Sequence, residues 1–218
     1  MHFTSRNFKK RILTSTILFT LLFLMVINNY FLSYILLVAA VLSILEFFKM
    51  NKIIQKNNIK EFILNLIFIF YISTFCTFFL IFSFYLHLKI IIFIILLVCV
   101  ASDIGGFAFG KLFKGPKLTK ISPKKTISGA IGSIILSSIL ALFLIYFVTK
   151  NIEPLAIIIG SITSAGCQLG DLFFSYLKRK SFVKDTGNTL PGHGGILDRI
   201  DGILLGLPLG FLTLVTIY

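Results

Sequence analysis

Apolar stretches long enough to cross a lipid bilayer recur along the whole chain, and they limit its fold more than any other feature. A transmembrane helix needs about 20 mainly apolar residues. The stretches that reach or approach this length are residues 12–27, 32–48, 62–84, 90–106, 127–148, 155–172 and 203–217. The last stretch is short, so we expect its helix to begin earlier, near Ile196.

The composition excludes a water-soluble protein. Hydrophobic residues make up 57% of the 218 residues and charged residues only 13%, whereas soluble chains carry roughly 25% charged residues. A soluble fold of this size could not hide so much apolar surface. We therefore predict an all-α, polytopic integral membrane helical bundle with about seven transmembrane helices. We expect a single domain over residues 1–218, with N-terminal spans in 1–101 and a motif-bearing catalytic half in 102–218.

The basic residues predict the orientation of the chain in the membrane. With the N-terminus in the cytoplasm, all of the 21 Lys and Arg residues except Lys89 and Lys150 fall on the cytoplasmic side. The opposite orientation would reverse this distribution. We therefore expect a multi-pass protein of the cell inner membrane with a cytoplasmic N-terminus and a site that faces the cytoplasm.

Aspartates gather at the predicted cytoplasmic ends of the spans. Asp103 would end the fourth span, Asp171 would end the sixth, and Asp198 and Asp201 would open the last. Residues i and i+3 share one face of a helix, so Asp198 and Asp201 would repel each other unless a cation lies nearby. Mg²⁺ suits such a place, because it binds a few carboxylates together with phosphate oxygens. Alternatively, these aspartates only mark where helices leave the membrane.

Two loops combine features that suit an anion. The sequence PGHGG at residues 191–195 precedes a helix start, and glycines let backbone N–H groups approach a ligand there. The sequence SPKKT at residues 122–126 places hydroxyl and ammonium groups before the fifth span. An ordinary bend and a solvated basic loop are the alternatives. Neither a P-loop nor a Rossmann motif follows a strand here. The residues alone therefore indicate a metal-dependent phosphate site that serves a soluble phosphate compound and a lipid.

The same segments resemble the phosphatidate cytidylyltransferase (CDP-diacylglycerol synthase) family. The resemblance is carried by SYLKR at 175–179, KD at 184–185 and LPGHGGILDRID at 190–201, with SPKKT at 122–126 and GDL at 170–172 upstream. It covers roughly residues 103 onward. The chain departs from the family pattern at Phe174, where an acidic residue is usual, at Phe182, where glycine is usual, and at Gly202, where serine is common.

The resemblance implies transfer of CMP from CTP to phosphatidic acid, which gives CDP-diacylglycerol and pyrophosphate. It implies a catalytic set of Asp171, Lys184, Asp198 and Asp201, in which Asp171, Asp198 and Asp201 bind Mg²⁺ as one ion, two ions or one ion with a monovalent cation. The implied substrate-binding residues are Ser122, Lys124, Lys125, Thr126, Lys178, Arg179, Asp185, His193, Gly194, Gly195 and Arg199. The expected partners are CTP, phosphatidic acid and membrane lipids, without nucleic acid, and a homodimer is one option for the assembly.

Three other functions compete with this interpretation. A CTP-dependent polyprenol or dolichol-type lipid kinase would transfer the γ-phosphoryl group and release CDP. A transporter or channel would use the aspartates along a cation path, although the acidic residues cluster on one predicted face. A CDP-alcohol phosphatidyltransferase would continue the DRIDG sequence at 198–202 with Ala-Arg and two further aspartates, which do not follow.

The metal assignment predicts the effect of Asp198→Asn. This change removes a negative charge that would hold a cation against the phosphates, so turnover should be lost while membrane insertion stays normal. CMP transfer by the purified variant measures this effect, and full activity would contradict the assignment of Asp198 to the metal.

Overall fold

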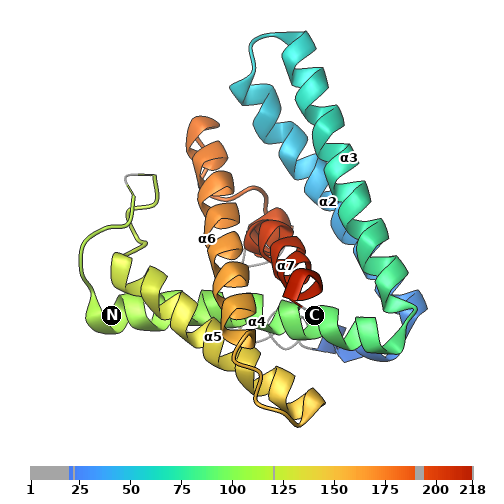
Figure 1. The fold of residues 1–218 in the computed structure, drawn as a ribbon. Helices are drawn as coiled ribbons and strands as arrows, with labels where there is room; N and C mark the ends of the chain where they lie inside the picture. Colours follow the sequence, from blue (N-terminus) through green and yellow to red (C-terminus); the bar gives the residue numbers. More distant parts are fainter. Residues whose placement is uncertain (1–19, 22, 120, 190–193, 218) are drawn as a thin grey trace. The chain divides into compact units, whose positions relative to one another are not determined.

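The computed structural model describes residues 20–21, 23–119, 121–189 and 194–217, and this part of the chain consists of long helices joined by loops (Figure 1). Its long helices are α2 (Asn29–Ile54), α3 (Asn58–Ser83), α4 (Leu86–Phe113), α5 (Ile127–Thr149), α6 (Ala156–Lys180) and α7 (Leu197–Ile217). All six are long and apolar enough to cross a membrane. The prediction of an all-helical protein with several membrane-spanning helices is confirmed, whereas the orientation of these helices in the membrane stays a prediction. The expected first span, 12–27, lies mostly outside the described residues. Its described residues, 20–21 and 23–27, are helical.

The helix boundaries agree with the apolar stretches at some ends and extend beyond them at others. Helix α5 begins at Ile127 as predicted, and α7 begins at Leu197, close to the earlier start that we expected. However, α4 continues to Phe113 and α6 to Lys180. Both helices therefore continue beyond Asp103 and Asp171, and the expectation that these aspartates end the fourth and sixth membrane spans stays a prediction. A helix continues as long as its backbone hydrogen bonds form, so polar residues do not have to stop it.

The chain divides into two compact units, and each consists of two stretches of sequence. The first unit comprises Met1–Tyr85 and Leu177–Arg199, and the second comprises Leu86–Tyr176 and Ile200–Tyr218. Helices α6 and α7 therefore each contribute residues to both units. The expected single domain with an internal division near residue 101 stays a prediction.

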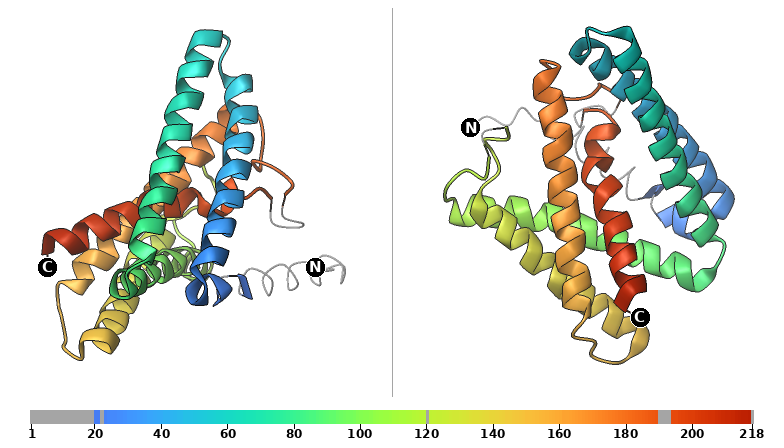
Figure 2. Two further views of the ribbon diagram at one scale, coloured as in Figure 1. Left: turned by 90° about the vertical axis from the view of Figure 1, so that its right-hand side faces the viewer. Right: turned by 45° about the horizontal axis from the view of Figure 1, so that its top comes forward.

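In the first unit, α2 and α3 form a helical hairpin (Figure 2). The rings of Phe47 and Phe68 stack with their centroids 3.9 Å apart. The amide of the buried Asn51 donates hydrogen bonds to the backbone carbonyl of Glu61 at 3.0 Å and to Oδ1 of Asn65 at 2.7 Å. Polar side chains that bond across helices are a common means of association within membranes. These contacts hold the two apolar helices together at one end.

Small residues let the helices of the second unit approach closely. A Cβ atom added to Gly105 of α4 would lie 2.7 Å from the carbonyl oxygen of Gly132 of α5. One added to Gly160 of α6 would lie 2.6 Å from the Cα atom of Ser138 of α5. Close backbone contact through small residues is typical of membrane helices, where apolar surface alone gives little drive to associate.

Buried hydroxyl groups add hydrogen bonds to these interfaces. Ser133 donates to the backbone carbonyl of Ser102 at 2.7 Å, and the hydroxyls of Ser102 and Ser164 lie 2.9 Å apart. Ser137 donates to the backbone carbonyl of Val98 at 3.1 Å. Such interhelical bonds contribute on the order of 0.6 kcal/mol each. Together they connect α4 to α5 and to α6.

The close packing of α5 and α6 can be tested with Gly160→Ala. The added methyl group would meet the backbone of Ser138, which cannot move without separating the helices, so we expect a loss of about 1–3 kcal/mol in unfolding free energy. Thermal unfolding in detergent measures the loss. Gly202→Ala is the matched control, because its methyl group would approach nothing closer than the Cys167 carbonyl oxygen at 3.2 Å. Equal losses in both variants would contradict this account.

Candidate functional site

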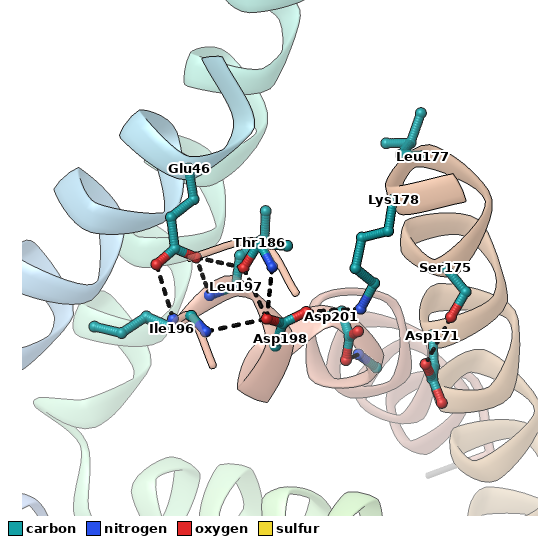
Figure 3. A network of polar contacts seen from close by, with 12 residues as sticks. Glu46, Asp171, Ser175, Leu177, Lys178, Thr186, Ile196, Leu197, Asp198 and Asp201 are labelled. Atoms are coloured by element: carbon teal, nitrogen blue, oxygen red, sulfur yellow. Dashed lines mark hydrogen bonds and ion pairs between the residues drawn. The ribbon is translucent and has the colours of Figure 1, made fainter. Parts of the chain in front are cut away.

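A buried carboxylate on α2 is the centre of the polar cluster in the first unit (Figure 3). The Glu46 residue is only 3% exposed, and its two oxygens accept four hydrogen bonds. Oε1 accepts from the Thr189 hydroxyl at 2.9 Å and from the backbone N–H of Ile196 at 3.1 Å. Oε2 accepts from the Thr186 hydroxyl at 2.7 Å and from the backbone N–H of Leu197 at 2.9 Å. All four donors belong to the loop before α7 or to the first residue of that helix.

A second carboxylate in this unit, Asp198, is paired with a lysine. The Lys178 ammonium group lies 2.7 Å from Oδ1, and the two side chains are only 11% and 7% exposed. Oδ2 accepts from the backbone N–H groups of Thr186 at 2.8 Å and Gly195 at 3.0 Å. The Thr186 hydroxyl also lies 3.0 Å from Oδ2. Because this hydroxyl is within hydrogen-bond distance of Glu46 as well, Thr186 links the two carboxylates.

The two carboxylates fit against the loop because glycines at the contact positions have no side chains. A Cβ atom on Gly187 would lie 2.7 Å from Glu46 Oε1, and one on Gly195 would overlap the Thr186 hydroxyl and the Glu46 carboxylate. Gly194 has a φ of 84°, a backbone conformation that favours glycine. The structure therefore gives the Gly194-Gly195 pair a role in closing the loop around acidic side chains. Their predicted contact with phosphate stays a prediction.

The remaining predicted residues of the first unit lie at its surface. Arg179, Lys184, Asp185 and Arg199 are exposed, in contrast to the buried Lys178. The predicted basic residues thus separate into one that neutralises Asp198 and several that face outward. His193 lies outside the described residues.

In the second unit the structure brings together two residues that were predicted from distant motifs. Lys125, next to the start of α5, forms an ion pair with Asp171 of α6, and the two side chains are 24% and 32% exposed. Ser175 donates to Asp171 Oδ1 at 3.4 Å. Thr126 caps α5, because its hydroxyl accepts the backbone N–H of Gly129 at 3.1 Å. A basic residue and an acidic residue of the predicted site are therefore in contact.

The other candidates of the second unit have separate surroundings. The Ser122 carbonyl accepts the backbone N–H of Lys125 at 3.0 Å, which closes the turn that carries the exposed Lys124. Asp201 is buried on α7, and its Oδ1 accepts the backbone N–H of Gly202 at 2.9 Å. Ser122 thus stabilises the turn through its backbone, and Asp201 lies in the interior of the second unit.

The predicted metal ligands do not form one compact acidic group. Within residues 20–21, 23–119, 121–189 and 194–217, no three His, Cys, Asp or Glu side chains form a group that could hold a metal ion. Asp171 and Asp201 belong to the second unit, and Asp198 belongs to the first. A Mg²⁺ ion needs only one or two carboxylates when substrate phosphates complete its shell. The assignment of the three aspartates to Mg²⁺ stays a prediction.

The structure gives a physical context for two departures from the family pattern. Phe174 is only 3% exposed, and its ring packs edge-on against Phe173 with the centroids 5.3 Å apart. This position therefore faces apolar surroundings. Phe182 follows the end of α6 with a φ of 58°, the left-handed region where glycine is favoured, and the residue is 93% exposed.

Sequence reasoning missed Glu46. The residue lies in the apolar stretch 32–48, close to its end, whereas the acidic cluster predicted from the sequence contains only aspartates. An acidic residue within an apolar helix is costly, so it usually faces the protein interior and finds polar partners. That rule would have marked Glu46 as a residue with a function, although it would not have named its partners.

Comparison with known proteins agrees with the resemblance of the motifs. The family model described as "Cytidylyltransferase family" matches residues 2–217. Similar proteins, each named phosphatidate cytidylyltransferase, come from Helicobacter pylori (strain J99 / ATCC 700824), Rickettsia felis and Staphylococcus saprophyticus. The first is 43% identical over 112 residues, which cover 51% of this chain and 42% of the relative. The second is 41% identical over 128 residues (54% and 56%), and the third is 47% identical over 118 residues (53% and 45%). The matches thus span about half the length of these relatives.

The buried ion pair predicts a large effect of Lys178→Met on stability. Removing the ammonium group leaves the Asp198 carboxylate buried without its cation, which should lower the unfolding free energy by about 3 kcal/mol. Chemical unfolding in detergent measures this loss. The Lys178→Met/Asp198→Asn double variant should lose less than the sum of the two single variants.

Arg179→Met is the control for Lys178→Met, since it removes an exposed charge from the adjacent position. We expect its unfolding free energy to stay within about 0.5 kcal/mol of that of the unchanged protein. A loss as large as that of Lys178→Met would mean that the buried ion pair is not the cause.

Proposed function

Because this chain belongs to the cytidylyltransferase family, we propose that it transfers CMP from CTP to phosphatidic acid and forms CDP-diacylglycerol and pyrophosphate. The observation that carries the proposal is the match of the family model to residues 2–217. The names of the relatives support the same reaction, and the apolar helices suit a lipid substrate. The motifs that resemble the family also contain both described ion pairs, Lys125–Asp171 and Lys178–Asp198.

The proposed reaction places one main demand on the protein. An ionised phosphate oxygen of phosphatidic acid forms a bond to the α-phosphorus of CTP, and the bond from that phosphorus to the pyrophosphate oxygen breaks. The nucleophile is already deprotonated, so no strong general base is required. Both reactants are anionic, and the protein must therefore bring them together and offset their repulsion.

Basic side chains from both units suit this task. In the first unit, the exposed Arg179, Lys184 and Arg199 can bind phosphate groups, and Asp185 can orient a lysine. The buried Lys178 is proposed to hold Asp198 in place. In the second unit, Lys124 and Lys125 supply positive charge beside the hydroxyls of Ser122 and Thr126. These roles are proposals for each unit by itself.

Carboxylates are the chemical type of ligand that Mg²⁺ requires. Asp171 suits this role, because its side chain is 32% exposed and can exchange Lys125 for a cation. Asp201 and Asp198 are proposed as further ligands on the basis of the sequence. When bound, Mg²⁺ would neutralise charge on the phosphates of CTP. We also propose that the N-terminus and the site face the cytoplasm, because that orientation places most of the basic residues inside.

The reaction can be tested by following each phosphate of CTP. Purified protein is incubated with phosphatidic acid in mixed micelles and with CTP labelled at the α-phosphate, with Mg²⁺ or with EDTA. We expect the label to enter the lipid, one pyrophosphate to be released for each lipid product, and the chelator to stop the reaction. In a parallel incubation with CTP labelled at the γ-phosphate, transfer of that label to the lipid with release of CDP would instead indicate the lipid kinase. Ion flux in vesicles without CTP turnover would indicate the transporter.

A further inference from the structure

We propose that Glu46 is a positioning residue, which holds the loop before α7 and the start of that helix in the arrangement that the site needs. Helix α2 would then contribute to catalysis as well as to the membrane-embedded fold. The inference rests on the proposed function for its effect on catalysis. Its structural basis is the set of contacts between Glu46 and the loop at 181–196, of which residues 190–193 lie outside the described part. Figure 3 shows the carboxylate at the end of α7 that begins with Leu197.

The first step of the argument is that Glu46 caps α7. The first backbone N–H groups of a helix have no acceptor within the helix itself. Here the N–H groups of Ile196 and Leu197 donate to opposite oxygens of Glu46, at 3.1 and 2.9 Å. A negative charge also interacts favourably with the positive end of the helix dipole. Glu46 is more than 140 residues away in sequence, so the cap fixes the start of α7 against α2.

The second step is that Glu46 and the loop depend on each other. A carboxylate that is only 3% exposed must be hydrogen-bonded, and among the described residues the loop supplies three of its donors and Leu197, the first residue of α7, supplies a fourth. The loop in turn has room for the carboxylate because Gly187 and Gly195 lack side chains. Neither could be changed without leaving polar groups of the other without a partner.

The third step connects this contact to the chemistry. The Thr186 hydroxyl that donates to Glu46 Oε2 at 2.7 Å also lies 3.0 Å from Asp198 Oδ2. Asp198 also accepts the backbone N–H of Gly195 and pairs with Lys178. A displacement of the loop would therefore move the surroundings of Asp198 and shift its ion pair. Glu46 acts on the site through these groups and is not itself required to touch a substrate.

The substitution Glu46→Gln tests whether the two backbone hydrogen bonds to Glu46 position the loop and the start of α7. Each oxygen of Glu46 accepts one backbone N–H, and backbone N–H groups can only donate. In either orientation of a glutamine amide, its NH₂ group would face one of these N–H groups. The size of the side chain is unchanged, so a role in filling space alone would tolerate the substitution.

We expect Glu46→Gln to lower kcat by about ten-fold or more in folded protein, while the KM for phosphatidic acid stays within about two-fold. Both constants are measured well below the unfolding temperature of the variant. Glu61→Gln on α3 is the matched control, and we expect it to keep the kcat of the unchanged protein.

A second measurement does not depend on activity. Trypsin cleavage after the exposed Lys184 in detergent-solubilised protein reports on the loop, and we expect Glu46→Gln to be cut at least several-fold faster than Glu61→Gln. Equal cleavage rates together with an unchanged kcat would overturn the inference. If the unchanged protein does not transfer CMP but Glu46→Gln is still cut faster, the proposed function fails while the role of Glu46 in positioning the loop holds.

Discussion

The polar contacts of the first unit depend on one buried carboxylate, that of Glu46. Glu46 lies on an apolar helix whose own backbone N–H groups are already used by the helix, so its hydrogen bonds must come from elsewhere. The described part of the loop before α7, together with Leu197, supplies them, and the carboxylate fits there because Gly187 and Gly195 lack side chains. Asp198 is then held by the same loop and by Lys178. Two acidic groups thus become stable inside the protein because one segment satisfies both.

In the second unit, glycines and serines determine how apolar helices pack against one another. Its helices are apolar on faces that lipid could cover equally well, so hydrophobic contact alone does not select their partners. Glycines such as Gly105 and Gly160 allow backbones to touch, and serines such as Ser133 donate hydrogen bonds across the interface. These short contacts specify which helix faces meet. The same unit holds the Lys125–Asp171 ion pair on that framework.

The helices were predictable from the sequence because stretches of about 20 mainly apolar residues leave few alternatives to a transmembrane helix. The ends of α4 and α6 were not, since the backbone hydrogen bonds of these helices continue into residues that are no longer mainly apolar. Motifs predicted Asp171, Lys125 and Asp198 as candidate site residues, but did not reveal that Asp171 pairs with Lys125 or that Asp198 accepts a hydrogen bond from the loop. Glu46 escaped attention because its partners are distant in sequence, and charge alone does not reveal which donors will surround it.

The length of α6 has a consequence for how a lipid could be used. Its 25 residues extend about 37 Å, whereas the hydrocarbon layer is only about 30 Å thick. If the helix runs along the membrane normal, its last turn stands at the depth of the lipid head groups and carries Arg179 and Lys180 there. The phosphatidic acid proposed above as substrate could then keep its acyl chains in the hydrocarbon while its head group meets these cations, so that the proposed reaction would need no extraction from the leaflet.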